Sequence, residues 1–147
     1  MTVRQLQAET NKPSSQFHDL RKDMPSGQQE IGSVRVEVLQ CVGLPKLDAV
    51  GETDAYCLAV CGAYAFLTDT IPENADPWWL SKMRRACIFP IFKEYARLYV
   101  GVFDAETDRD DNAGRTVMDL SRLRRTTSCF PYESRRMSTR SDREDVS

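Results

Sequence analysis

Carboxylates gather in two segments of this 147-residue chain, and their positions suggest metal binding rather than packing. The segment 44–56, LPKLDAVGETDAY, places Asp48 and Asp54 on either side of Gly51. The segment 102–114, VFDAETDRDDNAG, offsets its carboxylates with only one cation, Arg109; they are Asp104, Glu106, Asp108, Asp110 and Asp111. Like charges repel unless a cation neutralises them, and hard oxygen donors on loops suit Ca²⁺ better than Zn²⁺. The two segments therefore predict a calcium site.

Solvated acidic loops, in which Asp simply favours turns, are the alternative interpretation. An EF-hand does not explain the second segment. In the window 104–115 that pattern requires Gly at the sixth position and Glu at the last, where the chain has Arg109 and Arg115. The carboxylates need a different scaffold.

Catalysis is not expected. His18 is the only histidine, so the chain lacks the positioned imidazole base of Ser/His/Asp and Cys/His nucleophile systems. It also lies in a polar segment that is poorly suited to preorganising a site. Cys57 and Cys61 lack a second ligand pair nearby, and we interpret them as buried thiols rather than a metal site. We predict neither an enzyme nor a small-molecule substrate.

The overall charge argues against nucleic acid as a partner. Twenty Lys and Arg face twenty-two Asp and Glu, for a net charge of −2, whereas nucleic-acid binding relies on excess Lys and Arg. No apolar run approaches the roughly 18 residues of a membrane-spanning helix. The N-terminus lacks the apolar stretch of a secretory signal. We therefore expect a cytoplasmic protein with reduced cysteines.

Alternating apolar residues predict short strands between polar ends. The expected strands cover 34–38, 55–61, 64–71, 86–91, 98–103 and 114–118, and a helical turn covers 121–125. Residues 1–31 and 133–147 have few apolar positions and are expected to be disordered tails around a domain at 32–132. Closely spaced strands without room for crossover helices predict an all-β antiparallel sandwich.

The order of these segments resembles the C2 domains, β-sandwiches that bind phospholipid, often through Ca²⁺ held between loops at one end. The family's first strand, first calcium-binding loop and following strand are similar to the segment VRVEVLQCVGLPKLDAVGETDAYCLAV. TDTIPENADPWW resembles its Asn-Pro-x-Trp turn, and LYVGVFDAETDRDDNAGR its third loop. The resemblance covers about 34–132. It implies seven to eight strands. Because neither tail offers a good eighth, either an edge strand is short and poorly patterned or the sandwich lacks one edge strand.

The resemblance also implies a ligand set and a function. Its calcium ligands are Asp48 and Asp54 from loop one, with Asp104, Glu106 and Asp111 from loop three. Bound Ca²⁺ would turn a negative end of the sandwich positive and recruit anionic phospholipid, making the protein peripheral to membranes. Two departures from the family pattern, Ala55 after the second aspartate and Glu106 in place of Asp, are expected to lower calcium affinity.

Three further features leave alternatives open. Lys82, Arg84 and Arg85 could bind lipid headgroups or form a solvated face. Trp79 is expected to pack in the core, whereas Trp78 could pack or insert into a membrane. The alternative function is a Ca²⁺-independent protein-interaction module of degenerate C2 fold. Convergence of the two acidic loops at one end would favour the calcium interpretation.

Overall fold

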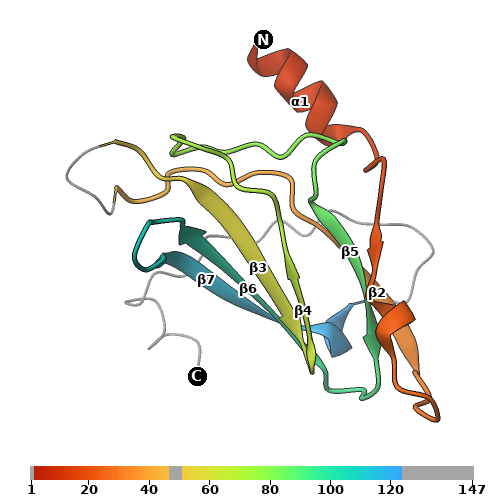
Figure 1. Ribbon diagram of the computed structural model, residues 1–147. Helices are drawn as coiled ribbons and strands as arrows, with labels where there is room; N and C mark the ends of the chain where they lie inside the picture. The colour runs from red at the N-terminus through yellow and green to blue at the C-terminus, as the bar shows by residue number, and fades with distance from the viewer. Residues whose placement is uncertain (1, 47–50, 124–147) are drawn as a thin grey trace.

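Strands make up most of the regular secondary structure in the computed structural model, which describes residues 2–46 and 51–123. Two sheets form the two layers (Figure 1). The strands order as β1-β5-β2 in one sheet and β4-β3-β6-β7 in the other, antiparallel apart from the parallel pair β1 and β5. The elements are α1 (Val3–Asn11), β1 (His18–Asp19), η1 (Leu20–Asp23), β2 (Gly32–Glu37), β3 (Ala55–Cys61), β4 (Tyr64–Leu67), β5 (Ala86–Ile91), β6 (Arg97–Asp104), β7 (Asp111–Asp119) and η2 (Leu120–Arg122). The expected all-β sandwich is confirmed.

The alternating pattern of the sequence accounts for the core between the sheets. Along β3 every second residue is buried, so Cys57, Ala59 and Cys61 face inward. Phe66 of β4 and Leu98 of β6 complete that side of the core. The opposing sheet contributes Cys87 and Phe89 of β5. β3 therefore buries one face, as a side-chain period of two predicts, whereas β5 buries residues on both of its faces.

A side chain ends β4 earlier than the sequence predicts. The Thr68 amide still donates to the Cys57 carbonyl at 3.0 Å, but the Thr68 hydroxyl accepts the Cys57 amide at 2.9 Å in place of a backbone carbonyl. The ladder of β4 therefore stops at Leu67, and Ile71 forms only an isolated bridge with Ala55. Thr68 explains why the expected strand 64–71 is shortened.

The expected N-terminal tail contains ordered elements in its described part. Helix α1 starts with a capping box, in which the Thr2 hydroxyl accepts the Gln5 amide and the Gln5 side chain accepts the Thr2 amide. We name residues 12–23 the N-terminal strap. It includes β1, which pairs with β5 through His18 opposite Cys87, and buried Leu20, which joins the core.

Trp79 lies in the core, as expected for a packing residue. Its side chain is fully buried, and Nε1 donates to the Asp69 carbonyl at 2.8 Å. The turn before it is held by Asp76, whose carboxylate accepts the Gly43 amide at 2.6 Å. This turn therefore connects the loop after β2 to the segment before β5.

Seven strands lie in the described residues, and one of them was not expected. Strand β1 lies in a polar segment whose composition does not predict a strand. Within residues 2–46 and 51–123, β2 pairs only with β5, so its other edge has no described partner. The expected tail 133–147 and the end of the expected turn 121–125 lie outside the described residues. Among the described helices, none has the length and apolar character needed to cross a membrane.

Candidate calcium site and basic pocket

The two acidic segments meet at the same end of the four-stranded sheet. Asp104, the last residue of β6, pairs with Ala55 at the start of β3 and with Asp111 at the start of β7. Asp54, Asp104 and Asp111 therefore lie beside the same strand ends. In Figure 1 the turn between β6 and β7 lies at the same end as the start of β3. The antiparallel register brings the predicted loops together.

Hydrogen bonds join loop one directly to loop three. The Asp54 amide donates to Oδ1 of Asp104 at 2.9 Å, and the Ala105 amide donates to the Asp54 carbonyl at 2.9 Å. Asp104 is only 2% exposed, so its carboxylate lies beneath the loops rather than in bulk water. A buried carboxylate is costly unless hydrogen bonds or a cation stabilise its charge. Asp104 is thus placed both to hold the loops together and to offer an oxygen to a cation.

The loop between β4 and β5 also contacts Asp54. The Glu73 amide donates to Oδ1 of Asp54 at 2.7 Å. Glu73 has a φ of 45°, the left-handed conformation that is uncommon for residues other than Gly, Asn and Asp. The bond to Asp54 stabilises this turn, so the Asp54 side chain positions the loop before Trp79 as well as its own.

Asp110 has a structural role that the sequence did not reveal. Its carboxylate accepts the Glu106 amide at 3.0 Å and the Tyr56 hydroxyl at 2.5 Å. These two bonds lower the pKa of Asp110, whereas burial and then the bond to Asp110 raise the pKa of Tyr56 to about 12. The Tyr56 ring stacks on Phe103 with a centroid distance of 5.5 Å. Asp110 therefore fastens loop three to the outer face of β3.

The described carboxylates of the two loops lie at one end of the sheet, but they do not form a complete metal site. Asp48 lies outside the described residues. Within residues 2–46 and 51–123, no three His, Cys, Asp or Glu side chains are close enough together to hold a metal ion. The oxygen donors of Asp54 and Asp104 have the hard chemistry that Ca²⁺ prefers, and Glu106 and Asp111 follow on the same loop. The donor chemistry fits Ca²⁺, and the complete ligand set stays a prediction.

Arg85 does not belong to a lipid-binding cluster, which corrects the sequence-based expectation. Its side chain is fully buried, and its guanidinium donates to Glu37 of β2, the Trp79 carbonyl, and Ser14 and Lys12 of the strap. Every nitrogen of the guanidinium has a protein partner, so none is left for a headgroup. Arg85 looked solvent-facing in the sequence because these partners lie up to 73 residues away.

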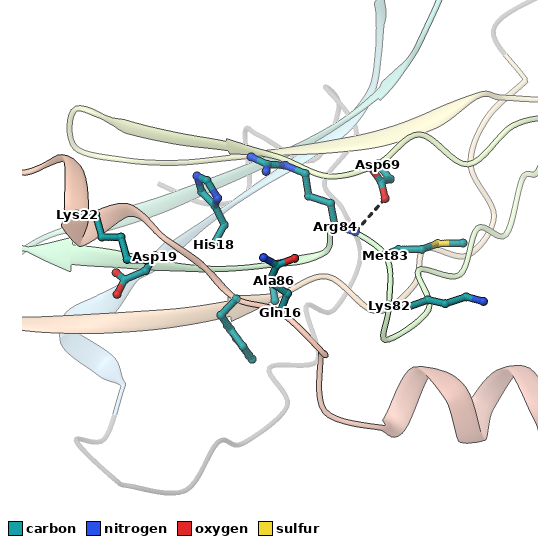
Figure 2. A pocket seen from close by; sticks show the side chains of 10 residues that line it. Gln16, His18, Asp19, Lys22, Asp69, Lys82, Met83, Arg84 and Ala86 are labelled. Carbon is teal, nitrogen blue, oxygen red and sulfur yellow. Dashed lines mark hydrogen bonds between the residues drawn. The ribbon is translucent and has the colours of Figure 1, made fainter.

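Lys82 and Arg84 remain exposed, and they line a pocket of about 470 Å³ together with residues of the strap. Figure 2 shows His18 beside the Arg84 side chain, with Lys22 toward one end of the pocket and Lys82 toward the other.

The capping box Thr2-x-x-Gln5 is the sequence pattern that could have indicated ordered structure near the N-terminus. No comparable pattern indicated β1.

The described cysteines are all buried and free, as expected for thiols that pack in the core. Burial raises the pKa of Cys61, and it raises that of Cys87 to about 12. A contact with Cys41, together with burial, raises the pKa of Cys57. High thiol pKa values disfavour the thiolate that binds metals, so these residues are core side chains.

Known proteins place this architecture in one family. The family model of the C2 domain matches residues 32–133. The chain therefore belongs to the C2 domain family, whose members are in general lipid- and membrane-binding modules and typically non-catalytic. A search of curated protein sequences found no match.

Solved structures support the fold independently. A C2 domain of plant extended synaptotagmin 1 is similar with a TM-score of 0.58 and 23% identity, over 65% of this chain and 73% of that one. The calcium-bound pair of C2 domains from extended synaptotagmin 2 is similar with a TM-score of 0.57 and 23% identity, over 63% of this chain and 36% of that one. Human GIVD cytosolic phospholipase A2 is similar with a TM-score of 0.55 and 24% identity, over 68% of this chain and 14% of that one. This chain thus spans only a small part of the phospholipase and about a third of the second synaptotagmin chain.

Proposed function

We propose that this C2 domain binds anionic phospholipid membranes in response to Ca²⁺, through the acidic end of the sandwich. The observation that carries the proposal is the hydrogen bond from the Asp54 amide to the Asp104 carboxylate. It joins the two loops that the sequence singled out, with Asp54 and Asp104 at one end of the sheet. Convergence of these loops is what a shared cation site requires.

The ligands we propose are Asp48, Asp54, Asp104, Glu106 and Asp111. Bound Ca²⁺ would supply positive charge and open coordination positions for lipid phosphate oxygens. The protein residues hold the loops in register beforehand. Asp104 fixes loop one against loop three, and Asp110 closes loop three onto Tyr56. Exposed Lys82 and Arg84 are proposed as a second contact with anionic headgroups.

Cosedimentation with phosphatidylserine vesicles tests this function. Wild-type protein is expected to pellet with vesicles in Ca²⁺ and to stay in solution with chelator. The double variant Asp104→Asn/Asp111→Asn should lose binding, since the introduced amide oxygen at position 104 keeps an acceptor for the Asp54 amide while the charge is removed. The control Asp23→Asn/Glu94→Gln removes the same number of charges from exposed positions outside the acidic end and should bind like wild type.

A Ca²⁺-independent protein-interaction module is the second candidate function. It is favoured by the engagement of Asp110 with Tyr56 and Glu106, and by the lack of three gathered carboxylates among the described residues. Failure of the wild-type chain to pellet with vesicles in any condition would contradict the membrane proposal and favour this candidate. Calorimetric titration with Ca²⁺ alone separates a lost calcium site from a lost membrane contact.

A further inference from the structure

The four-stranded sheet carries apolar side chains on both of its faces. Its inner face packs against the other sheet, and no described helix or strand covers the opposite side, which we name the outer face (Figure 1). Alternate residues of a strand point to opposite faces, so Leu58 and Val60 point outward from β3. Neither residue lies in the core between the sheets. The alternation along β3 therefore produces a second apolar surface rather than a polar one.

Exposed apolar side chains continue the outer face on both sides of β3. Leu58 lies opposite Leu67 of β4. Val60 lies opposite Tyr99 of β6, which lies opposite Val117 of β7. The outermost three, Leu67, Tyr99 and Val117, are 49%, 47% and 48% exposed. Because side chains opposite one another in neighbouring strands contact each other, these residues form connected rows rather than isolated apolar positions.

An aromatic ring closes the gap that a glycine would leave in the outer face. Gly101 of β6 lies opposite Leu58 and has no side chain to offer there. A Cβ at position 101 would lie 2.9 Å from Cε2 of Phe103, so the Phe103 ring lies directly against this glycine. Phe103 also stacks on Tyr56 with a centroid distance of 5.5 Å. The apolar surface is therefore continuous from β4 to β7.

The outer face is large enough for a reversible contact between proteins. Four strands about 4.8 Å apart, each residue advancing about 3.3 Å over 97–103, cover roughly 400 Å². Monomeric proteins rarely expose a contiguous apolar patch of more than a few hundred Å². Two such faces in contact would bury roughly 800 Å² in total, about half of a standard stable interface. A partner with a face of the same size is therefore expected to bind reversibly.

Opposite charges lie at the two ends of the outer face. In the turn between β6 and β7, residues 105–110, one cation, Arg109, lies among three carboxylates. At the other end β6 begins with exposed Arg97, which lies opposite Asp119 of β7. Asp119 accepts bonds from Ser121 and lies 3.9 Å from Arg122. Cations are in excess at this end among residues 92–97 and 119–122: Lys93, Arg97 and Arg122 against Glu94 and Asp119.

We propose that the outer face binds a second copy of this chain in a reversible two-fold dimer, with the strands of the two copies running antiparallel across the contact. A two-fold axis brings the same apolar rows together from both copies. The antiparallel arrangement lays the acidic end of each copy over the basic end of the other, whereas a parallel one would set the two acidic ends against each other. The charge pattern therefore fits a second copy twice over. The dimer does not depend on the calcium site.

Sedimentation equilibrium of the full chain, in reducing buffer with chelator, measures this self-association. Wild type is expected to shift from monomer toward dimer as its concentration rises to about 300 µM, because contacts of this size dissociate in the micromolar range. Tyr99→Lys and Val117→Lys each place a charge within the contact and should weaken the dimer about tenfold or more. Circular dichroism verifies that each variant is folded.

A matched substitution on the other sheet is the control. Ile31 is 45% exposed and directly precedes β2, so Ile31→Lys makes the same kind of change outside the outer face and should dimerise like wild type. Arg97→Glu tests the antiparallel arrangement. It sets a carboxylate against the acidic end of the other copy and should weaken the dimer severalfold.

Three results would overturn the dimer. They are a wild-type chain that stays monomeric up to about 300 µM, a dimer that neither Tyr99→Lys nor Val117→Lys weakens, and a dimer that Ile31→Lys weakens equally. An Arg97→Glu variant that dimerises as well as wild type contradicts the antiparallel arrangement. Because every measurement is made in chelator and without vesicles, failure of the calcium-dependent function is measured separately.

Discussion

The guanidinium of Arg85 is completely buried and pairs with Glu37 across the sheet, with Nη2 2.7 Å and Nε 2.9 Å from the same carboxylate oxygen. Arg85 immediately precedes β5, and Glu37 is the last residue of β2. The same guanidinium contacts the strap through Ser14. The ion pair of Arg85 with Glu37, together with the bond to Ser14, therefore connects the paired strands β2 and β5 to the N-terminal strap.

Replacing Arg85 with Met should destabilise the domain by about 3 kcal/mol or more. The substitution leaves the Glu37 carboxylate without its cation and the Trp79 carbonyl without its guanidinium donor, and a partly buried charge without a counterion is costly. Urea unfolding followed by circular dichroism measures the change. Arg122→Ala is the control, because Arg122 is exposed and lies 3.9 Å from its partner Asp119. It should change stability by less than about 0.5 kcal/mol. Equal stability of both variants would show that the Arg85 network contributes little.

Trp79→Phe should lower the free energy of unfolding by about 1–3 kcal/mol. The smaller ring leaves a void in the core and loses the indole bond to the Asp69 carbonyl. Trp78 is only partly buried, so Trp78→Phe should have a smaller effect. Chemical denaturation of both variants provides the comparison. A larger loss for Trp78→Phe would contradict the assignment of Trp79 as the packing residue.

Acid should weaken the start of η1 in the strap. The side-chain bond from Arg21 lowers the pKa of Asp19 from 3.8 to about 2. Since the folded-state pKa lies below the unfolded one, this stabilisation is complete above about pH 4 and is lost as the pH falls toward 2. NMR titration of the Asp19 carboxyl measures the pKa. A midpoint near 3.8 would contradict the bond.

Native Cys87 should react very slowly with alkylating reagents. Burial raises its pKa from 9.0 to about 12, which lowers its thiolate fraction at pH 8 about a thousandfold before steric protection is counted. Mass spectrometry of peptides after timed iodoacetamide labelling gives the rate at each cysteine. Labelling in urea supplies the unprotected reference. Comparable native and denatured rates would show that the core opens readily.

Sequence patterns predict the strands that are rich in apolar residues and bounded by turn residues. The limits of β3 and β5 agree with the expected ranges 55–61 and 86–91, and β6 and β7 extend their expected ranges. Both faces of these strands carry apolar residues bounded by turn residues, so local chemistry is sufficient. Loop convergence was left open by the sequence, because it depends on the pairing of two strands that are not consecutive, which places the end of β6 beside the start of β3.

Features that depend on distant partners were not predictable in this way. Strand β1 is a two-residue parallel pairing in a polar segment, and it exists because β5 offers an edge and Arg85 anchors Ser14. Thr68 ends β4 by substituting its hydroxyl for a backbone acceptor, which no period reveals. The contact of Asp110 with Tyr56, 54 residues away, was not visible in a sequence that showed only an aspartate within the second acidic segment.

The position of the strap also fixes an order of events during synthesis. Ser15 contacts Ser81 and Ser14 contacts Arg85, so the strap leaves the ribosome long before its partners exist. At roughly 5–20 residues per second, the intervening 66 to 71 residues correspond to a delay of about 3–14 seconds. During that interval Leu20 and the segment around it have no core to join. The strap is thus made well before the residues that hold it in place, and a nascent chain stalled before Arg85 would carry this segment exposed.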